Sequence, residues 1–495
     1  MMLLPLLLAW AGSLAIETAG SPRPIGRRPA DLAIRLGGYA LLTAFWFQFS
    51  WRPWLAAFSC LLTVAIFEAV SRLKRRVIGE PLVFSDFALL AQVPRFPDLY
   101  YVPPFTDPRM AGPIGLGIAG IAAWYAIEPA WLPAGAPAAV AAFCALPAAL
   151  LSVWSAARVE PLRGLVRTRW PRPNLDADVA RYGQPATLLA YLLRRFDERR
   201  TASPPPAIPA RHAGGDEVVV VVQLESFVDP ARLGGPDLPL MDRIRTEAVQ
   251  YGRLRVPAHG AYTMRTEHAV LTGRSANSLG FGAFDPYLSG GGREPTSLAR
   301  IARDAGYETV FVHPFDPTFF DRTAVFAKLG FDRLVTEDAF PDASRVGPYV
   351  GDEAVAARIL EEVRSSSGPI LVFCVTMENH GPWKPGRLPG IDDPLAQYLH
   401  HVAGTGRAVE ALIDGLAGRR ATLCVFGDHA PSLPTCRPGF GGTRTDYAIF
   451  RFGPNEPSPP RRVDLAAHEL GCLLRGALAP EMTVPHDASV TVPPS

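Results

Sequence analysis

The chain has 495 residues, of which 48% are hydrophobic and 19% are charged, and its mean hydropathy is +0.12. The chain is longer than one ordinary domain and more apolar than an ordinary soluble enzyme, so we expect a membrane part and a soluble part. The formal net charge is only +2, and there is no basic block of the kind found in nucleic-acid-binding proteins. Nucleic acid is therefore not an expected partner.

Five apolar runs near the N-terminus have about the length of membrane spans. They are residues 1–16, 37–50, 54–70, 113–131 and 136–156. Crossing ~30 Å of hydrocarbon takes roughly 20 residues of helix, so the second and third runs are short. The first run lacks the positive region and the small-residue cleavage site of a signal peptide, which favours an uncleaved span. We expect a transmembrane domain of about five helices over residues 1–157.

An odd number of spans places the two ends of this domain on opposite sides of the membrane. With the N-terminus inside, everything after residue 158 lies outside the cytoplasm. The positive-inside rule opposes this orientation, because it places five basic residues in external loops: Arg27, Arg28, Lys74, Arg75 and Arg76. Between the two expected hairpins, the aromatic-rich segment from Phe84 to Tyr101 is either an interfacial element or a plain loop.

The composition changes twice after the last apolar run. Residues 158–215 are rich in Arg and Pro, which predicts a juxtamembrane helix followed by a linker. Over residues 216–480, short β-branched runs alternate with amphipathic runs of helix length, a pattern typical of an α/β domain with a mainly parallel central sheet. The expected strands are residues 218–224, 309–312, 370–375, 421–426 and 447–452. A Pro-rich tail, residues 481–495, is expected to be disordered.

Polar side chains follow four of the expected strands. In chain order they are Glu225, then His313, then His380, then Asp428 with His429. Ligands of open α/β sheets bind at the carboxyl ends of the strands, where these side chains would meet. Taken singly, a carboxylate in such a position is more often a helix cap or a loop residue, and a lone histidine is more often structural. Their joint occurrence indicates a functional site.

Thr263 lies where a Gly-containing loop leads into a helix-forming run within residues 259–273. A helix N-terminus favours an anion such as phosphate, although Thr is also an ordinary N-cap residue. Together, Glu225, Thr263, Asp428 and His429 would suit one divalent metal with oxygen and nitrogen ligands. Such a metal would lower the pKa of the Thr263 hydroxyl, and we expect a covalent phospho-threonine intermediate.

The combined order of these motifs resembles the lipoteichoic acid synthase and phosphoglycerol transferase branch of the alkaline phosphatase and sulfatase superfamily. The motifs are Leu224-Glu225-Ser226-Phe227, Thr263 with Glu267 four residues later, Asn379-His380 and Gly427-Asp428-His429. The resemblance covers about residues 216–480, and the N-terminal region with Phe84-Ser85-Asp86-Phe87 also looks like that branch. It implies a soluble domain on the extracytoplasmic, periplasmic side of the plasma membrane, which decides the orientation conflict.

The resemblance also implies residue roles. Glu225, Thr263, Asp428 and His429 would ligate the metal, with Thr263 as the nucleophile. His380 looks like the family histidine near the attacking and leaving oxygens. Arg322 looks like the arginine that holds the lipid-derived phosphate, as a guanidinium fork can. His313 and Phe320 would line the headgroup pocket.

Three departures from the family pattern bear on the headgroup rather than on the nucleophile or the metal. Phe320 stands where some relatives carry Trp, Phe315 where they carry an acidic residue, and His268 where they carry an aromatic residue. Residue 263 is not part of a Cys-x-Pro-x-Arg type motif, so sulfate-ester hydrolysis is not expected. Oxygen-rich ligation with one histidine suits Mn²⁺ or Mg²⁺, whereas Zn²⁺ would bind more tightly on general affinity grounds.

These residues predict a membrane-anchored phosphoglycerol transferase. It would move glycerol phosphate from phosphatidylglycerol to an extracytoplasmic glycan or glycolipid. The alternatives are a phosphoethanolamine transferase, a phosphodiesterase or sulfatase-type hydrolase, and an inactive envelope scaffold. The six cysteines have no metal-binding spacing, and Cys436 and Cys472 are candidates for a disulfide in an oxidising compartment.

Overall fold

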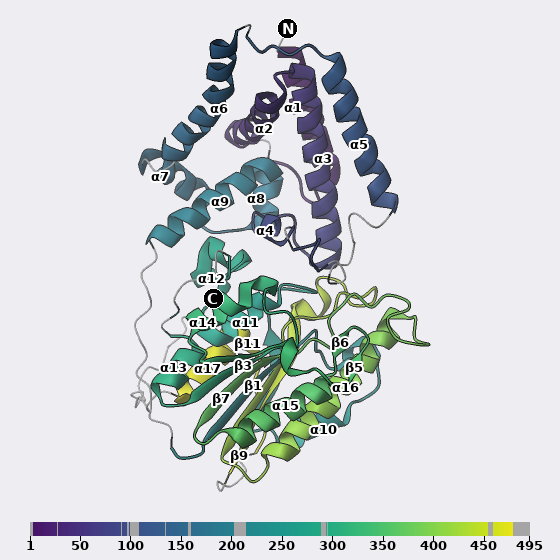
Figure 1. The fold of residues 1–495 in the computed structure, drawn as a ribbon, viewed down its shortest axis with the longest axis vertical. Coiled ribbons are helices and arrows are strands. Elements are labelled where there is room, and N and C mark those ends of the chain that lie inside the picture. Colours follow the sequence, from purple (N-terminus) through teal and green to yellow (C-terminus); the bar gives the residue numbers. More distant parts are fainter. Residues whose placement is uncertain are drawn as a thin grey trace, which may run out of the picture.

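A computed structural model describes most of the chain. The described residues are 3–26, 28–90, 92–96, 99, 108–133, 135–156, 160–201, 214–288, 294, 296–453 and 459–478. A bundle of long helices stands above an α/β domain, and the two parts are in contact (Figure 1). The expected disordered tail, residues 481–495, and most of the expected linker lie outside the described residues.

The helices that precede the first strand form the bundle and the layer beneath it. They are α1 (Leu3–Gly20), α2 (Pro29–Ser50), α3 (Pro53–Val77), α4 (Asp86–Leu90), α5 (Pro108–Ile127), α6 (Ala136–Ala156), α7 (Glu160–Arg169), α8 (Leu175–Tyr182) and α9 (Gln184–Thr201). Proline occupies the first turn of α2 and of α3, where its fixed φ suits a helix and its missing N–H costs nothing.

Among the described residues, α1, α2 and α3 are long and apolar enough to cross a membrane, while residues 115–127 of α5 and 136–145 of α6 form shorter apolar stretches. Nearly all large hydrophobic side chains that are exposed among these residues lie at or before Phe196, with Leu473 the exception. Exposed apolar surface on this scale is what lipid tails cover. The number of spans, expected to be five, stays a prediction.

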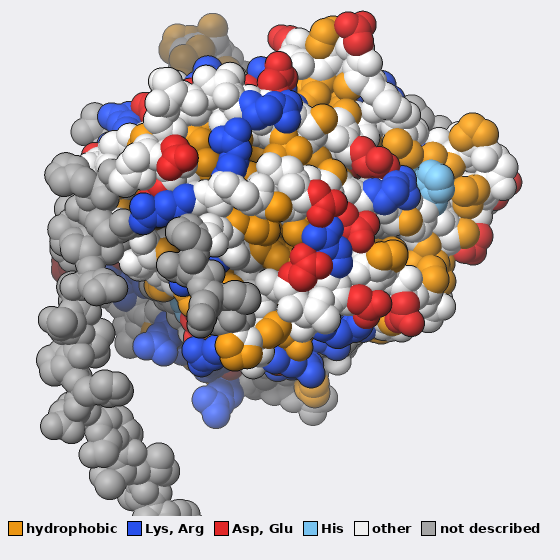
Figure 2. Space-filling view, turned by 90° about the horizontal axis from the view of Figure 1, so that it is seen from below, with side chains coloured by type: hydrophobic (Ala, Val, Ile, Leu, Met, Phe, Trp, Pro, Cys, Tyr) orange, Lys and Arg blue, Asp and Glu red, His pale blue; other side chains and the backbone are white. Residues whose placement is uncertain are grey.

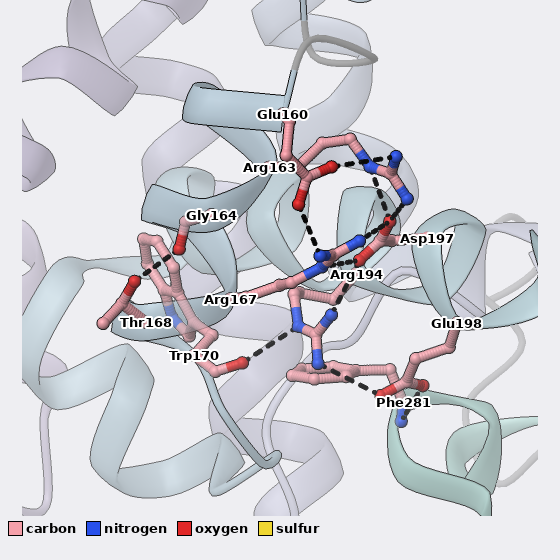
Figure 3. Close-up of polar contacts among 10 residues, drawn as sticks. All are labelled: Glu160, Arg163, Gly164, Arg167, Thr168, Trp170, Arg194, Asp197, Glu198 and Phe281. Atoms are coloured by element: carbon pink, nitrogen blue, oxygen red, sulfur yellow. Dashed lines mark hydrogen bonds and ion pairs between the residues drawn. The ribbon is translucent and has the colours of Figure 1, made fainter. Parts of the chain in front are cut away.

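Three helices occupy the region where we expected one juxtamembrane helix. Arg163 and Arg167 of α7 both bind the Asp197 carboxylate of α9 (Figure 3). The next residue, Glu198, accepts a hydrogen bond from the amide of Phe281, 2.8 Å away, in the α/β domain. The juxtamembrane helices are therefore joined to one another and to the α/β domain by partly buried polar contacts.

The α/β domain contains one mixed sheet with the strand order β10-β2-β9-β8-β1-β7-β3-β4, and β11 also pairs with β2. Its strands are β1 (Val218–Leu224), β2 (Gln250–Arg255), β3 (Glu308–Val312), β4 (Arg333–Val335), β7 (Ile370–Val375), β8 (Ala421–Gly427), β9 (Arg444–Phe452), β10 (Arg461–Arg462) and β11 (Leu465–Ala466). The central strands β8, β1, β7, β3 and β4 are parallel, whereas β9 is antiparallel to both of its neighbours. This architecture confirms the expected fold class.

Helices cover both faces of the sheet, and the central strands are buried on both sides (Figure 1). One face is covered by α10 (Pro239–Glu247), α15 (Asp352–Ser365) and α16 (Pro394–Leu416); the other by α11 (Thr263–Thr272), α13 (Leu298–Asp304), α14 (Arg322–Leu329) and α17 (Ala467–Leu478). Along β1, the odd and even valines pack into opposite cores, which explains its unbroken apolar sequence.

The end of the α/β domain farthest from the bundle has a more polar surface than the bundle has. Basic and acidic side chains are interspersed there with small apolar patches (Figure 2). Such a mixed surface is ordinary for a domain that faces water.

Candidate active site

The strand register brings two carboxylates together at the carboxyl edge of the sheet. Leu224 lies opposite Gly427 where β1 pairs with β8. Glu225 and Asp428 are the next residues of these two parallel strands, so they leave the sheet side by side. His429 follows Asp428 directly and completes a buried group of three.

The ligand atoms of Glu225, Asp428 and His429 all lie within 4.8 Å of one another. His429 Nε2 is 3.5 Å from Glu225 Oε1 and 3.5 Å from Asp428 Oδ2. Burial, and then the neighbouring Glu225 charge, raise the pKa of Asp428 to about 6. Asp428 Oδ2 is buried, and none of the described residues donates a hydrogen bond to it.

This donor set fits a divalent cation. Two carboxylates that share one buried site repel each other, and a metal ion between them removes this cost while using the unpaired Asp428 oxygen. The backbone reinforces the arrangement, because Ser226 donates its amide to Asp428 at 2.8 Å and its hydroxyl to Glu225 at 2.8 Å. Ser226 has a φ of +52°. Ser226 can hold both carboxylates only in this backbone conformation, which its residue type does not predict.

Thr263 lies beside the same carboxylates. Its hydroxyl donates to Glu225 Oε2 across 3.5 Å, and its side chain is 7% exposed. Thr263 is the first residue of α11, and the N-cap position belongs to Tyr262, whose side chain makes no capping bond. The Thr263 hydroxyl is thus directed at the carboxylates instead of capping its own helix.

Tyr262 holds a left-handed backbone, with φ 63° and ψ 43°. For a bulky side chain this conformation costs on the order of 1–3 kcal/mol and persists only where the surroundings enforce it. The strained residue directly precedes Thr263, so it sets the direction in which α11 starts.

A second buried group lies next to the first. Arg322 donates to Glu267 Oε2 at 3.1 Å and to His313 Nε2 at 2.9 Å. His313 Nδ1 is 3.0 Å from the Val375 carbonyl, so the neutral tautomer with its proton on Nδ1 fits both contacts. Burial, and then the Arg322 charge, lower the pKa of His313 well below its usual value.

Phe320 lies at the edge of this second group, 5.4 Å from the Arg322 guanidinium. Arg322 is 1% exposed, and its charge is matched by Glu267, a residue of the Thr263 motif for which the sequence predicts no role. The signal was present in the sequence, because residues four apart on a helix share a face and Glu267 follows Thr263 by four.

His380 lies on the loop after β7. Its ring is 5.9 Å from the ring of Tyr349, and its Nδ1 is 2.5 Å from the Gly381 carbonyl. Burial lowers the pKa of His380 to about 4. The preceding Asn379 donates to the Glu225 backbone carbonyl at 3.1 Å, which ties this loop to the carboxylate pair.

The structure thus places the residues expected from the sequence in two neighbouring groups. Glu225, Asp428, His429 and Thr263 form one; Arg322, His313 and Phe320 form the other. Among the described contacts, none joins His380 to Thr263 directly. All six cysteines are free, so Cys436 and Cys472 do not pair.

Residues 217–454 match the protein family described as Sulfatase. Together with the mixed sheet and the carboxylate site at its edge, this match identifies a sulfatase-like domain of the alkaline phosphatase superfamily. Members of this superfamily are phosphotransferases or hydrolases, and their domains bind a divalent metal.

The capsular polysaccharide biosynthesis protein RkpI of Rhizobium meliloti (strain 1021) is 34% identical over 441 residues, which cover 85% of this chain and 81% of RkpI. This similarity shows that the chain belongs to the same family as RkpI. A putative cyclic beta-1,2-glucan modification protein of the same organism is 31% identical over 277 residues, covering 53% of this chain and 42% of that protein.

The fold of the whole chain is similar to that of the integral membrane protein lipooligosaccharide phosphoethanolamine transferase A (EptA) from Neisseria meningitidis. The TM-score is 0.50 with 14% identity, covering 92% of this chain and 96% of EptA. This likeness confirms the expected combination of a multi-span helical domain with an α/β domain.

Proposed function

We propose that the protein is a membrane-anchored phosphotransferase that moves glycerol phosphate from phosphatidylglycerol to an extracytoplasmic glycan or glycolipid. The observation that carries this proposal is the position of the Thr263 hydroxyl at the start of a helix, 3.5 Å from a carboxylate of the buried group Glu225, Asp428 and His429. The names of the two curated relatives concern a capsular polysaccharide and a glucan, which supports a saccharide acceptor.

The site holds the parts of a two-step transfer. Glu225, Thr263, Asp428 and His429 would bind one divalent metal, Mn²⁺ or Mg²⁺ with Zn²⁺ as the alternative. When bound, the metal supplies positive charge that lowers the pKa of the Thr263 hydroxyl and polarises a phosphoryl oxygen. Thr263 Oγ1 then attacks the phosphorus, the bond from phosphorus to the diacylglycerol oxygen breaks, and diacylglycerol leaves with a proton.

In the second step the acceptor hydroxyl attacks phospho-Thr263. The new bond joins the acceptor oxygen to phosphorus, and Thr263 Oγ1 is released and takes up a proton. His380 has a pKa held low by burial, so its ring is neutral near pH 7, and it is the residue proposed to assist proton transfer from the acceptor. Arg322 and Phe320 would lie at the headgroup end of the donor lipid.

Two of the basic residues that oppose a periplasmic α/β domain are paired in the fold. Lys74 lies 3.0 Å from Glu80 and 2.7 Å from Asp86, and Arg75 lies 3.2 Å from Asp176. The positive-inside rule counts Lys and Arg and gives acidic residues little weight, so this pairing does not remove the objection. The proposed periplasmic orientation is therefore based on the family resemblance.

The first test is diacylglycerol release from labelled phosphatidylglycerol by the purified full-length protein with Mn²⁺. We expect Thr263→Ala to abolish release, and Thr263→Ser, which keeps a hydroxyl, to retain part of it. Glycerol phosphate should be trapped on the wild-type protein. Phosphatidylethanolamine is offered as a competing donor: if it reacts instead, the chemistry holds but the headgroup is wrong. If neither lipid reacts with Mn²⁺, Mg²⁺ or Zn²⁺, the transferase proposal is wrong.

A further inference from the structure

The loop that leads into α11 lies against the last turn of the membrane helix α3. Gly260 has a φ of +67°, and a Cβ at this position would come within 2.9 Å of the Val77 carbonyl oxygen. The Gly260 amide donates to the Ala430 carbonyl, 2.9 Å away, in the loop that carries Asp428. The approach to Thr263 is therefore held between the end of a membrane helix and the loop of a proposed metal ligand.

Tyr262 is attached to the segment that follows α3. Its hydroxyl donates to Asp86, which belongs to the motif Phe84-Ser85-Asp86-Phe87. The Lys74 ammonium lies 5.1 Å from the centre of the Tyr262 ring and 2.7 Å from the Asp86 carboxylate. Tyr262 is 7% exposed. Its left-handed backbone is thus enforced by a buried hydrogen bond and a cation on its ring.

Arg265, two residues after Thr263, is attached to the same segment. Its guanidinium donates two hydrogen bonds to Glu80, at 3.0 and 2.8 Å, and its centre lies 4.0 Å from the Tyr262 ring centre. A bidentate pair of this kind fixes orientation as well as distance. Burial alone would raise the pKa of Glu80, but Arg265 and Lys74 lower it to about 2, so this carboxylate is charged at every working pH.

We propose that residues 74–86 are a positioning element for the Thr263 nucleophile, with Glu80 and Asp86 as its main positioning residues. They hold Tyr262, directly before Thr263, and Arg265, two residues after it, and so set the direction in which the Thr263 hydroxyl meets the carboxylates. This inference rests on the proposed function, because it gives the segment a role in the attack by Thr263. The membrane domain then contributes to the rate of the chemical step in addition to anchoring the enzyme.

Another ion pair at the end of α3 provides a matched control. Arg75 follows Lys74, but its guanidinium binds Asp176 of α8 at 3.2 Å, away from the nucleophile loop. Asp176→Asn weakens a contact of the same helix end without touching Tyr262 or Arg265. Glu80→Gln keeps the shape of the side chain and removes its charge, and Tyr262→Phe removes one hydroxyl.

The experiment compares these three variants with the wild type as full-length proteins with Mn²⁺. A single-turnover reaction with labelled phosphatidylglycerol gives the rate of phospho-Thr263 formation, and steady-state assays give the KM for the lipid. Hydrogen exchange of the peptide 259–272 reports the order of the helix start without any substrate. Mn²⁺ affinity reports the position of Thr263 as a metal ligand.

For Glu80→Gln and Tyr262→Phe we expect phospho-Thr263 formation to slow about 10- to 100-fold, because a small misplacement of a reacting group has an effect of this size. The KM should change less than about threefold, exchange in 259–272 should rise and Mn²⁺ should bind more weakly. Asp176→Asn should match the wild type in every measurement.

Two results would overturn the inference. In the first, Glu80→Gln and Tyr262→Phe match the wild type in hydrogen exchange and in the single-turnover rate. In the second, hydrogen exchange in 259–272 rises while the single-turnover rate stays unchanged, which makes the segment a structural contact only. If the wild type turns over no lipid, the proposed function fails, and Mn²⁺ affinity decides about the segment. Weaker binding in both variants but not in Asp176→Asn supports the positioning role, and unchanged binding refutes it.

Discussion

Arg322 has almost no solvent exposure, yet its charge is matched inside the same buried group by Glu267 at 3.1 Å, with His313 as a third member. Removing one partner of a buried ion pair usually costs about 3–5 kcal/mol, because it leaves a charge without compensation. The group is therefore a rigid support at the expected headgroup end of the site. His313 can accept the hydrogen bond from Arg322 only while its ring is neutral.

This requirement predicts how stability depends on pH. Above about pH 6.5, His313 is neutral in the folded and the unfolded chain. Below that pH the unfolded chain takes up a proton, while burial and Arg322 keep the pKa of folded His313 low. Stability should therefore fall as the pH falls, by about 1.4 kcal/mol per pH unit for this one group.

The test is the pH dependence of the thermal midpoint of the full-length protein between pH 7 and 5. His313→Gln can still accept from Arg322 and donate to the Val375 carbonyl, but it does not titrate, so its midpoint should fall less steeply. Other histidines still titrate in both proteins, so only the difference in slope counts. Equal slopes in the two proteins would show that His313 titrates in the folded protein as it does in the unfolded chain.

Residue types alone predicted where the carboxylates lie, but not how the backbone holds them. Glu225, Asp428 and His429 were found because each follows a strand, and the register then places them together. The positive φ of Ser226 and Tyr262 left no such signal, because neither is glycine and both conformations are enforced by distant contacts. Strain of this kind depends on tertiary structure, so it first appears in the fold.

Among the helices, α11 and α17 pack with their backbones in close contact. A Cβ added at Gly471 of α17 would come within 2.3 Å of the Val270 carbonyl oxygen of α11. Gly471→Ala should separate the two helices and lower stability by roughly 1–3 kcal/mol, as overpacking does. Because α11 carries Thr263, the rate of lipid turnover should fall as well.

The same helix contains its own control. Gly476 of α17 is exposed, and a Cβ added there would have no atom of another described residue within 4 Å. Gly476→Ala should raise stability by roughly 0.5–1 kcal/mol, since alanine loses less backbone entropy in a helix. Thermal midpoints and activities of the two variants measured side by side check both statements. A Gly471→Ala protein as stable and active as Gly476→Ala would mean that the helices do not touch as described.

The elements best predicted from the sequence are the buried central strands. The expected strands 218–224 and 370–375 coincide with β1 and β7, and the expected strand 421–426 ends one residue before β8 does. Their continuous β-branched sequences follow from burial on both faces. The short edge strands β10 and β11 have too few residues to show a pattern, and Pro171 and Gly183 separate three helices where composition indicated one.

At the scale of the whole molecule, the charges and the apolar surface bear on the same question of how the chain crosses the membrane. A count of basic residues in external loops opposed the expected orientation. Lys74 and Arg75 are paired with carboxylates in the fold. The positive-inside rule counts Lys and Arg whatever acidic residues lie near them, so the orientation has to be measured.

The helices α5 and α6 decide between three spans and five. Their apolar side chains are far more exposed than those of a soluble pair, with Ile127 at 81% and Val140 at 63%, so we expect lipid to cover them. Five spans put the turn at Leu132 in the cytoplasm and Arg23 on the periplasmic side. If α5 and α6 lie on the membrane surface instead, both positions are periplasmic.

Labelling with a membrane-impermeant maleimide tests this on intact cells that make the full-length protein. The two exposed cysteines, Cys144 and Cys472, are first replaced by serine, since the other four are buried. We expect Arg23→Cys to react on intact cells and Leu132→Cys to react only after the membrane is permeabilised, because the turn between α5 and α6 is then first reached. Labelling of Leu132→Cys on intact cells would reduce the membrane domain to three spans. It would leave the α/β domain periplasmic, because three spans are also an odd number.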